Sequence, residues 1–442
     1  MPNEGYPYLS DLKADVRLLG CIPLLNPFPD HVSSQRGMML SNHIPQSQLL
    51  IRNEFPRIFS GFEPQTGEYE ASTSNREEDI TVLWTIPKFR TQQGSHPLRY
   101  NPVTTVIYWG RESGQFGCFD VEGYTARSDN YGYTNIMMNT QKLESNYLIP
   151  KEDKLVTSPA HHGNMYNLGT NLRIAYMSLP HVTEDAWVIS ESAAAKLATE
   201  GFSTCIIDIH KDQIPLNLYG DDEEEYKIFP DIGDEVRSDG VICALRKPSA
   251  DSFIYDTCQA NLSEIQPLHD TKFYAPPGAT VVDVRIHINR KTRSKMKVSE
   301  AMIEQCEKYR GHLSNYYNEI WECYRKITER DSESKLTPHF NLLVADAICE
   351  LQVDGRRIRG FTSDTAVQPI RKKEVIEFIH IELTYKYTRK LNKGFKLSGR
   401  YGNKGVVSKI VPDEDMPVDE NGLRADIIGS AISGFNRIDL CR

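Results

Sequence analysis

The sequence lacks several of the short patterns that usually point to a function. Its nine cysteines include no CxxC pair, so neither a zinc site nor a dithiol redox motif is indicated. Scattered thiols of this kind fit a reducing compartment by default. No apolar run is long enough to span a membrane, and the polar N-terminal residues do not resemble a signal peptide. We therefore expect a cytoplasmic protein that does not associate with membranes.

The common phosphate-binding motifs are also missing. A P-loop has two glycines separated by four residues, followed by Lys and then Ser or Thr. Gly394 and Gly399 have this spacing, but Arg400 and Tyr401 follow them. No dinucleotide-binding glycine fingerprint follows an expected strand either. These motifs therefore give no support for an ordinary P-loop or Rossmann enzyme.

Charge is distributed unevenly along the chain. The net charge of −9 argues against a protein that simply coats DNA, yet residues 386–409 carry eight Lys or Arg and no acid. Residues 285–297 carry six more cations, while Asp221–Glu225 is acidic. Basic strips in an acidic chain are typical of a nucleic-acid channel in a larger assembly. For residues 285–297 taken alone, a solvated charged face explains the composition equally well.

The most informative stretch is KLSGRYGNKGVVSK, residues 396–409, in which cations alternate with glycines. Glycine lets a backbone approach a ligand closely and tolerates positive φ, and Lys and Arg supply cations for phosphate. The pattern predicts a loop that binds phosphate or nucleic acid. A solvated basic turn is the alternative on composition alone.

Hydrophobic periodicity predicts the main elements around this stretch. Apolar and polar residues alternate over 277–288 and 379–387, which indicates two strands. Residues 299–330 have one apolar face and predict a long helix, and Thr337-Pro338 predicts the start of a second helix that ends near Gly355. The two helices could form an antiparallel hairpin, either as an arm that docks a partner or as ordinary packing. No linker looks long enough to separate domains, so we expect one interlocked body.

The run from Lys386 to Arg437 resembles the active-site segment of the β subunit of multisubunit DNA-directed RNA polymerases. That segment reads roughly GDKxAGRHGNKGVxSKI and then EDMPxxExGxPxDI, and here VPDEDMPVDENGLRADI begins at Val411. Two further segments, PFPDHVSSQRGMMLSN from Pro27 and TEDAWVISES from Thr183, are similar to family motifs and occur in family order. Residues 296–375 match no motif and occupy the position of the family's flap.

The resemblance implies an α+β, β-rich fold with a discontinuous double-psi β-barrel. An inserted flap or wall region would contain the helical hairpin near 299–352. The implied domains are a core region facing the active site, the first part of the barrel, the wall-like insertion, and the second part of the barrel with the basic active-site stretch. They correspond to residues 1–160, 161–215, 216–375 and 376–442.

The resemblance also implies roles for particular residues. Lys396 and Lys404 would be catalytic, facing the RNA 3′ end and the incoming nucleotide, where they neutralise charge at the reacting phosphate. The phosphates of the NTP would be bound by Arg437 and Arg36, and the second magnesium would lie near Glu184 and Asp185. The residues expected to bind nucleic acid are Arg400, Lys409, Lys390, Asn42 and Gln46. The chain departs from the family pattern at Phe395, Tyr401, Phe435 and Asn436.

The implied reaction is Mg2+-dependent nucleotidyl transfer, with the main magnesium ligands on a β′-type subunit. Expected partners are an N-terminal-side β piece, a remaining C-terminal β piece, β′-type subunits, template DNA, RNA product and NTPs, with a promoter-specificity factor possible. The sequence starts and stops inside the β pattern, so we expect a piece of a split β subunit like those of large bacteriophages, located in the host cell. Two alternatives stay open: a non-catalytic nucleic-acid-binding or structural subunit, and an unrelated phosphotransferase.

Overall fold

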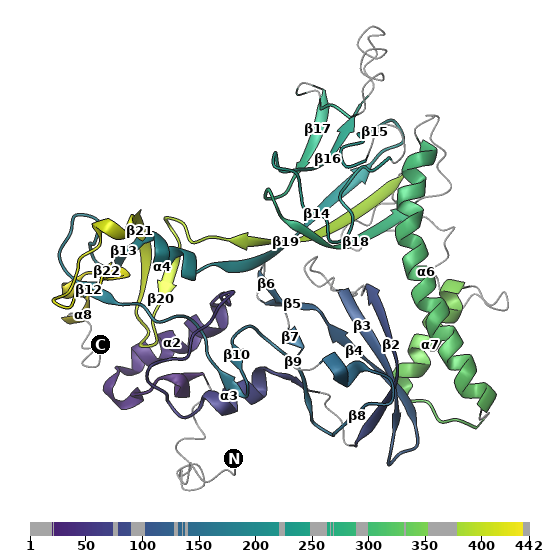
Figure 1. The fold of residues 1–442 in the computed structure, drawn as a ribbon, viewed down its shortest axis with the longest axis horizontal. Helices are drawn as coiled ribbons and strands as arrows, with labels where there is room; N and C mark the ends of the chain where they lie inside the picture. The colour runs from purple at the N-terminus through teal and green to yellow at the C-terminus, as the bar shows by residue number, and fades with distance from the viewer. Residues whose placement is uncertain are drawn as a thin grey trace. The chain divides into compact units, whose positions relative to one another are not determined.

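A computed structural model describes most of the chain in a mixed α+β, strand-rich fold (Figure 1). The described residues are 20, 22–73, 78–89, 102–127, 131–134, 136–137, 140–220, 226–247, 263–265, 267, 269–288, 299–330, 333–351 and 378–435. Within these ranges, no helix combines the length and the apolar character that crossing a membrane requires. The double-psi barrel and the flap remain predictions.

The chain divides into two compact units that are both discontinuous in sequence. Unit 1 is made of residues 1–72, 157–200 and 388–442, and unit 2 is made of residues 73–156 and 201–387. We expected one interlocked body, but the structure has two compact units. The chain passes four times between these units. The predicted boundaries of the four domains stay predictions.

Unit 1 is organised around a five-stranded mixed sheet with the order β12-β22-β13-β21-β20. Its central strands β13 and β21 are parallel, whereas β20 is antiparallel to β21. The strands are β12 (Ile174–Tyr176), β13 (Ala186–Ser190), β20 (Lys396–Ser398), β21 (Lys404–Val411) and β22 (Ile427–Gly429). The sheet thus joins segments that lie more than 200 residues apart in the sequence.

Helices and short strands complete unit 1. The side chain of Ser190 caps the helix that follows β13, because its hydroxyl accepts a hydrogen bond from the amide of Ala193 at 3.2 Å. The elements are η2 (Pro23–Leu25), η3 (Pro29–His31), α2 (Ser34–Gln46), α3 (Glu63–Glu70), β10 (His161–His162), β11 (Met165–Tyr166), α4 (Glu191–Lys196), η7 (Asp413–Asp415) and α8 (Ala431–Phe435).

Among the described residues, unit 2 contains a four-stranded sheet of order β4-β3-β2-β8 and two three-stranded sheets of orders β14-β19-β18 and β15-β16-β17, and short strands form a further sheet of order β1-β9-β7. The predicted strands over 277–288 and 379–387 are confirmed as β18 and β19, which pair with each other antiparallel. The strands are β2 (Ile80–Phe89), β3 (Pro102–Gly110), β4 (Phe116–Glu122), β8 (Leu148–Ile149), β14 (Thr199–Ile209), β15 (Ile214–Pro215), β16 (Val241–Arg246), β17 (Asp270–Tyr274), β18 (Thr280–Ile288) and β19 (Ile379–Arg389). The short elements are β1 (Ser72–Thr73), β5 (Tyr124–Arg127), β6 (Tyr131–Thr134), β7 (Ile136–Met137), η5 (Thr140–Leu143) and β9 (Lys154–Thr157).

Two helices of unit 2 confirm the prediction of a long helix followed by a second one. They are α6 (Ser299–Arg330) and α7 (Pro338–Leu351). The described side chains of the predicted apolar face of α6 are buried or partly buried, and they belong to two cores. Cys306 and Tyr309 pack with the β14-β19-β18 sheet, while Ile320 and Ile327 pack with α7 and β2 to β4. Figure 1 shows α6 running along both groups of strands, and this packing accounts for its length without an exposed arm.

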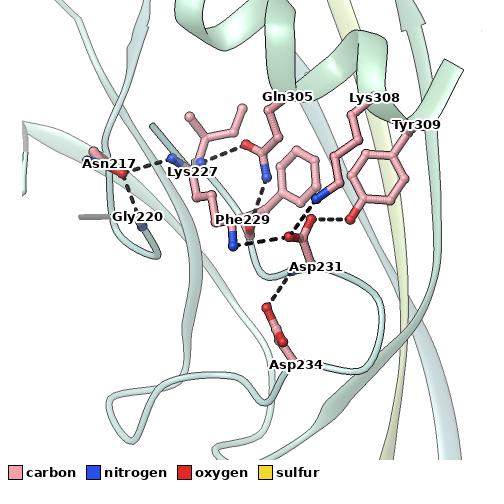
Figure 2. Close-up of polar contacts among 10 residues, drawn as sticks. Asn217, Gly220, Lys227, Phe229, Asp231, Asp234, Gln305, Lys308 and Tyr309 are labelled. Atoms are coloured by element: carbon pink, nitrogen blue, oxygen red, sulfur yellow. Dashed lines mark hydrogen bonds and ion pairs between the residues drawn. The ribbon is translucent and has the colours of Figure 1, made fainter. Parts of the chain in front are cut away.

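The N-terminal half of α6 is also held by polar contacts to the segment 226–234 (Figure 2). The hydroxyl of Tyr309 donates to Asp231, and the ammonium groups of Lys308 and Lys227 lie 3.1 and 3.2 Å from the same carboxylate. Burial opposes the charge of Asp231, but the hydrogen bonds from Tyr309, Lys308 and Lys227 outweigh it and lower the pKa of Asp231. Gln305 adds two hydrogen bonds to the backbone of residues 228 and 229. Three side chains of α6, those of Gln305, Lys308 and Tyr309, thus fix this segment to the helix.

Candidate functional site

The glycine- and lysine-rich stretch forms a β-hairpin in unit 1, where the sequence predicted a loop. Residues 396–398 are β20 and residues 404–411 are β21, so only the five residues between them form the turn. The inner face of the hairpin is apolar, since Leu397 and Val407 belong to a hydrophobic cluster with Ile189 of β13. The core of unit 1 therefore supports the hairpin along its length.

Lys396 and Lys404 lie on the outer face of this hairpin. Ser398 pairs directly with Lys404, and Lys396 lies two residues before Ser398, so the three side chains share a face. Diagonal neighbours of this kind are about 7–8 Å apart. Both lysines are exposed. The hairpin thus presents two ammonium groups, within reach of one phosphate chain, from strands rather than from a loop.

Two of the glycines in this stretch are explained by close approach to other backbone. Gly402 has φ +73°, and a Cβ there would lie 2.2 Å from the carbonyl oxygen of Arg36. A Cβ at Gly405 would lie 2.0 Å from the carbonyl oxygen of Asp185. Side chains at either position would push the hairpin away from α2 or from β13. The glycines therefore serve the packing of the site, which the sequence did not reveal.

Two side chains of helix α2 contact the hairpin, one at its turn and one at the end of β20. The Arg36 guanidinium donates to the carbonyl oxygen of Gly402 at 3.2 Å, and Nδ1 of His43 lies 2.9 Å from Oγ of Ser398. Burial, together with the charges of Lys404 and Arg36, lowers the pKa of His43 below its usual 6.5. A neutral imidazole is thus part of this basic site. His43 was missed in the sequence, although it directly follows the motif that runs from Pro27 to Asn42.

Arg400 lies at the turn and is half-buried. Its Nη1 donates to the carbonyl oxygen of Ile58 at 2.6 Å, and its Nη2 donates to that of Leu25 at 2.7 Å. The same Nη2 lies 3.3 Å from Oε1 of Glu63, a carboxylate whose side chain is only 2% exposed. Burial lowers the pKa of Arg400, which Glu63 partly offsets. Arg400, which the sequence predicted to bind nucleic acid, therefore makes three hydrogen bonds within the chain.

The acidic pair Glu184-Asp185 comes next to the hairpin at the start of β13. The carbonyl oxygen of Asp185 accepts a hydrogen bond from the amide of Val406 at 2.9 Å, and Glu184 is exposed with a positive φ of 51°. Carboxylates are ligands of the type that Mg2+ prefers. Across the described part of the chain, however, no three His, Cys, Asp or Glu side chains lie together as a metal site would need. A role of this pair near a magnesium ion stays a prediction.

The other predicted site residues are more dispersed. Lys409 is exposed on β21, opposite Val188 of β13, and beyond a register shift from Lys404. Lys390 is exposed just after β19, and Asn42 and Gln46 are exposed on α2. Arg437 lies outside the described residues. The structure therefore brings together the two hairpin lysines, Arg400, Arg36 and the backbone of the acidic pair.

Comparison with known families identifies the chain. The model of RNA polymerase Rpb2, domain 6, matches residues 123–437, which include the hairpin and both helices of unit 2. The chain belongs to this family. Arg36, Asn42 and Gln46 lie before the residues matched by the Rpb2 domain 6 model.

Curated relatives give the same result over nearly the whole chain. A protein of Chlamydia pneumoniae named DNA-directed RNA polymerase subunit beta is 24% identical over 500 residues, which covers 96% of this chain and 37% of the relative. A protein of the same name from Solidesulfovibrio magneticus is 24% identical over 491 residues, which covers 94% of this chain and 34% of the relative. The chain thus spans about a third of the length of these relatives.

Proposed function

We propose that this member of the Rpb2 domain 6 family is part of the β subunit of a multisubunit DNA-directed RNA polymerase. The observation that carries the proposal is the pair of exposed lysines, Lys396 and Lys404, on one face of a supported hairpin. The family match and the names of the relatives supply the reaction class. The chain would act in nucleotidyl transfer, in which a 3′-hydroxyl attacks an α-phosphate and pyrophosphate leaves.

In this reaction the hairpin supplies fixed positive charge. Lys396 and Lys404 stabilise the negative charge that develops on the phosphate in the transition state, because preorganised cations need no rearrangement at that moment. Arg36 and Arg437 would hold the triphosphate, while Lys390, Lys409, Asn42 and Gln46 would contact nucleic acid. Mg2+, when bound, supplies further charge neutralisation and orientation of the phosphates. Glu184 and Asp185 would contribute to its binding beside ligands from a β′-type subunit.

The family match and the names of the relatives also support a proposed assembly. The chain would work with other β-subunit sequence and a β′-type subunit, on template DNA, RNA and NTPs. A split β subunit of bacteriophage type and a location in the cytoplasm of the host remain predictions from the sequence. Mass spectrometry of the native complex, which counts the polypeptides that carry β sequence, tests the split directly.

Two other functions make different predictions. A non-catalytic subunit that only binds nucleic acid would leave RNA synthesis unchanged when the hairpin lysines are removed. An unrelated phosphotransferase would hydrolyse or transfer phosphate as an isolated chain, without partner subunits or a nucleic-acid template.

The decisive test uses the assembled complex on an RNA–DNA scaffold and measures the rate of adding one nucleotide. Lys404→Ala should slow this step by about 10²–10³-fold, the usual cost of removing one preorganised charge-stabilising group, and Lys396→Ala should act similarly. Lys393→Ala is the matched control, because Lys393 is exposed in the same basic stretch but precedes β20. Unchanged rates in the Lys396→Ala/Lys404→Ala double variant would refute the proposed function.

A further inference from the structure

The side chain of Arg400 connects the hairpin to other parts of unit 1. The turn between β20 and β21, residues 399–403, lies beyond the last strand pair of the hairpin, which is Ser398 with Lys404. Arg400 binds it to two separate backbone segments, through the carbonyl oxygens of Leu25 and Ile58 at 2.7 and 2.6 Å. The fork of the guanidinium allows both contacts at once.

Glu63 reinforces the connection to the segment that contains Ile58. Its Oε1 accepts a hydrogen bond from the amide of Ser60 at 2.8 Å, and its Oε2 accepts one from the amide of Gly61 at 2.9 Å. The carboxylate therefore shapes the turn that precedes α3 and at the same time lies 3.3 Å from Arg400. A carboxylate that is 2% exposed needs such partners, because a buried charge without them is strongly unfavourable.

We propose that Arg400 and Glu63 form an anchor pair that positions Lys396 and Lys404 for the reaction. This inference rests on the proposed function, and it assigns both members as positioning residues that do not touch substrate. The anchor pair acts with the hydrogen bond from Arg36 to Gly402, so the turn is held on two sides. Fixed geometry matters here because misplacing a reacting group by about 1 Å can cost on the order of 100-fold in rate.

The competing interpretation is the one that the sequence predicts, a direct contact between Arg400 and nucleic acid. For that contact the guanidinium would have to use its remaining donors, or leave two carbonyl oxygens and the buried Glu63 carboxylate. The two interpretations differ most clearly in what the loss of Glu63 should do. A nucleic-acid contact would be kept or strengthened when Arg400 is released, whereas an anchor pair would fail.

The test compares Arg400→Gln, Glu63→Gln and the double variant in the assembled complex. Three quantities are measured: hydrogen exchange of the amides of residues 398–404, kcat and KM for single-nucleotide extension, and the salt dependence of scaffold binding. We expect both single variants to accelerate exchange in the turn and to lower kcat by about 10- to 100-fold. KM and the salt slope should stay unchanged, and the double variant should be no worse than the singles. Arg400→Lys should restore activity only in part, since it keeps the charge but not the fork.

A control on the same helix and two opposite outcomes make the result decisive. Glu68→Gln, an exposed position of α3, should change none of the three quantities. A salt slope reduced by about one in Arg400→Gln, with normal or tighter binding in Glu63→Gln, would establish the direct contact and overturn the anchor pair. Unchanged exchange in both single variants would also overturn it.

The exchange measurement keeps this inference separate from the proposed function. Faster exchange in the anchor variants of a complex whose lysine variants synthesise RNA normally would leave the anchor pair standing and refute the function. The reverse combination, inactive lysine variants with unchanged exchange in the anchor variants, would refute the anchor pair alone.

Discussion

Arg36 and Arg437 are both proposed to bind the triphosphate, but only Arg36 can be placed in the structure. Its guanidinium donates to Gly402 and contacts Sδ of Met39 at 3.5 Å, so part of its hydrogen-bonding capacity shapes the site. The fork of an arginine carries five donors, which leaves donors for phosphate oxygens. Arg36 can therefore position the hairpin and bind a ligand at the same time.

Arg437 provides the sharpest test at the level of one residue, because the family pattern around it has changed to Phe435 and Asn436. If it binds the triphosphate tail in both the ground state and the transition state, Arg437→Ala should raise KM and leave kcat nearly unchanged. Losing a charge-assisted hydrogen bond costs about 1.5–3 kcal/mol, or roughly 10- to 150-fold in KM at about 1.4 kcal/mol per decade. Extension rates against NTP concentration for the wild type, Arg437→Ala and Arg437→Lys measure this. Three equal KM values would show that Arg437 has lost the role.

The sequence predicted which charged residues belong to the candidate site, but it did not predict the contacts that hold them in place. Lys396 and Lys404 were found from composition and motif, because cations among glycines are unusual. His43 and Ser398 were not found, since their hydrogen bond joins residues 355 positions apart and no local pattern records such a contact. Sequence reasoning likewise could not show that Arg400 meets Glu63, or that Gly405 is needed for the approach of β13.

Among the elements, the β14-β19-β18 sheet carries a buried titratable group. Nδ1 of His380 lies 2.5 Å from Asp208, its Nε2 lies 3.3 Å from Glu382, and Arg285 of β18 pairs opposite Glu382. Burial disfavours the charged imidazole, but hydrogen bonds to Glu382 and Asp208 outweigh it and raise the pKa of His380 above its usual 6.5. Because the folded pKa is the higher one, the stabilisation is complete below about pH 6.5 and is lost as the pH rises through the folded pKa.

His380→Gln should therefore destabilise this sheet more at pH 6 than at pH 9. The expected loss at pH 6 is about 1.5 kcal/mol, the low end for a hydrogen bond to a charged group, because Asp208 is partly exposed. Hydrogen exchange of β19 at the two pH values, corrected for intrinsic rates, gives the difference. His339→Gln, an exposed position on α7, serves as the control. Equal losses at both pH values would show that the charge of His380 does not stabilise the sheet.

Helix α6 offers a second test at this scale, in the contacts drawn in Figure 2. Tyr309→Phe removes one donor to the Asp231 carboxylate and leaves the ring packing against Phe229 in place. We expect the segment 226–234 to open more easily by about 1.5–3 kcal/mol, which is the usual worth of a hydrogen bond to a charged group. Amide exchange in that segment is the measurement. Tyr324→Phe is the control, since Tyr324 shows a ring contact with Trp321 but no side-chain hydrogen bond among the described residues.

The fold was predictable from the sequence where its causes are local. The helices over 299–330 and after Pro338, and the strands over 277–288 and 379–387, follow from periodicity and capping. The five-stranded sheet of unit 1 was not predictable from periodicity. It pairs Ala186–Ser190 with Lys404–Val411, and the pairing depends on packing between segments far apart in the chain. Only the order of family motifs pointed to that combination.

For the whole molecule, the chain spans about a third of its curated relatives, and both units expose large apolar side chains. Met38 and Ile432 of unit 1 are 69% and 65% exposed, and Leu342 of unit 2 is 65% exposed. In unit 1 the rings of Phe55 and Phe59 lie 6.4 Å apart and are each about half exposed. Apolar groups exposed together in this way are typical of interfaces with other chains.

We therefore expect the chain to be obligately assembled. Expressed alone it should aggregate, and co-expression with the partners proposed above, other β-subunit sequence and a β′-type subunit, should restore solubility. The double variant Phe55→Ser/Phe59→Ser distinguishes an interface from a surface that only promotes aggregation. It should make the isolated chain more soluble and yet reduce the yield of complex. Both effects are expected because the rings that cause aggregation would be buried on assembly. Size-exclusion chromatography of both preparations measures the two effects. A monodisperse wild-type monomer at high concentration, or a normal yield of complex from the double variant, would contradict this expectation.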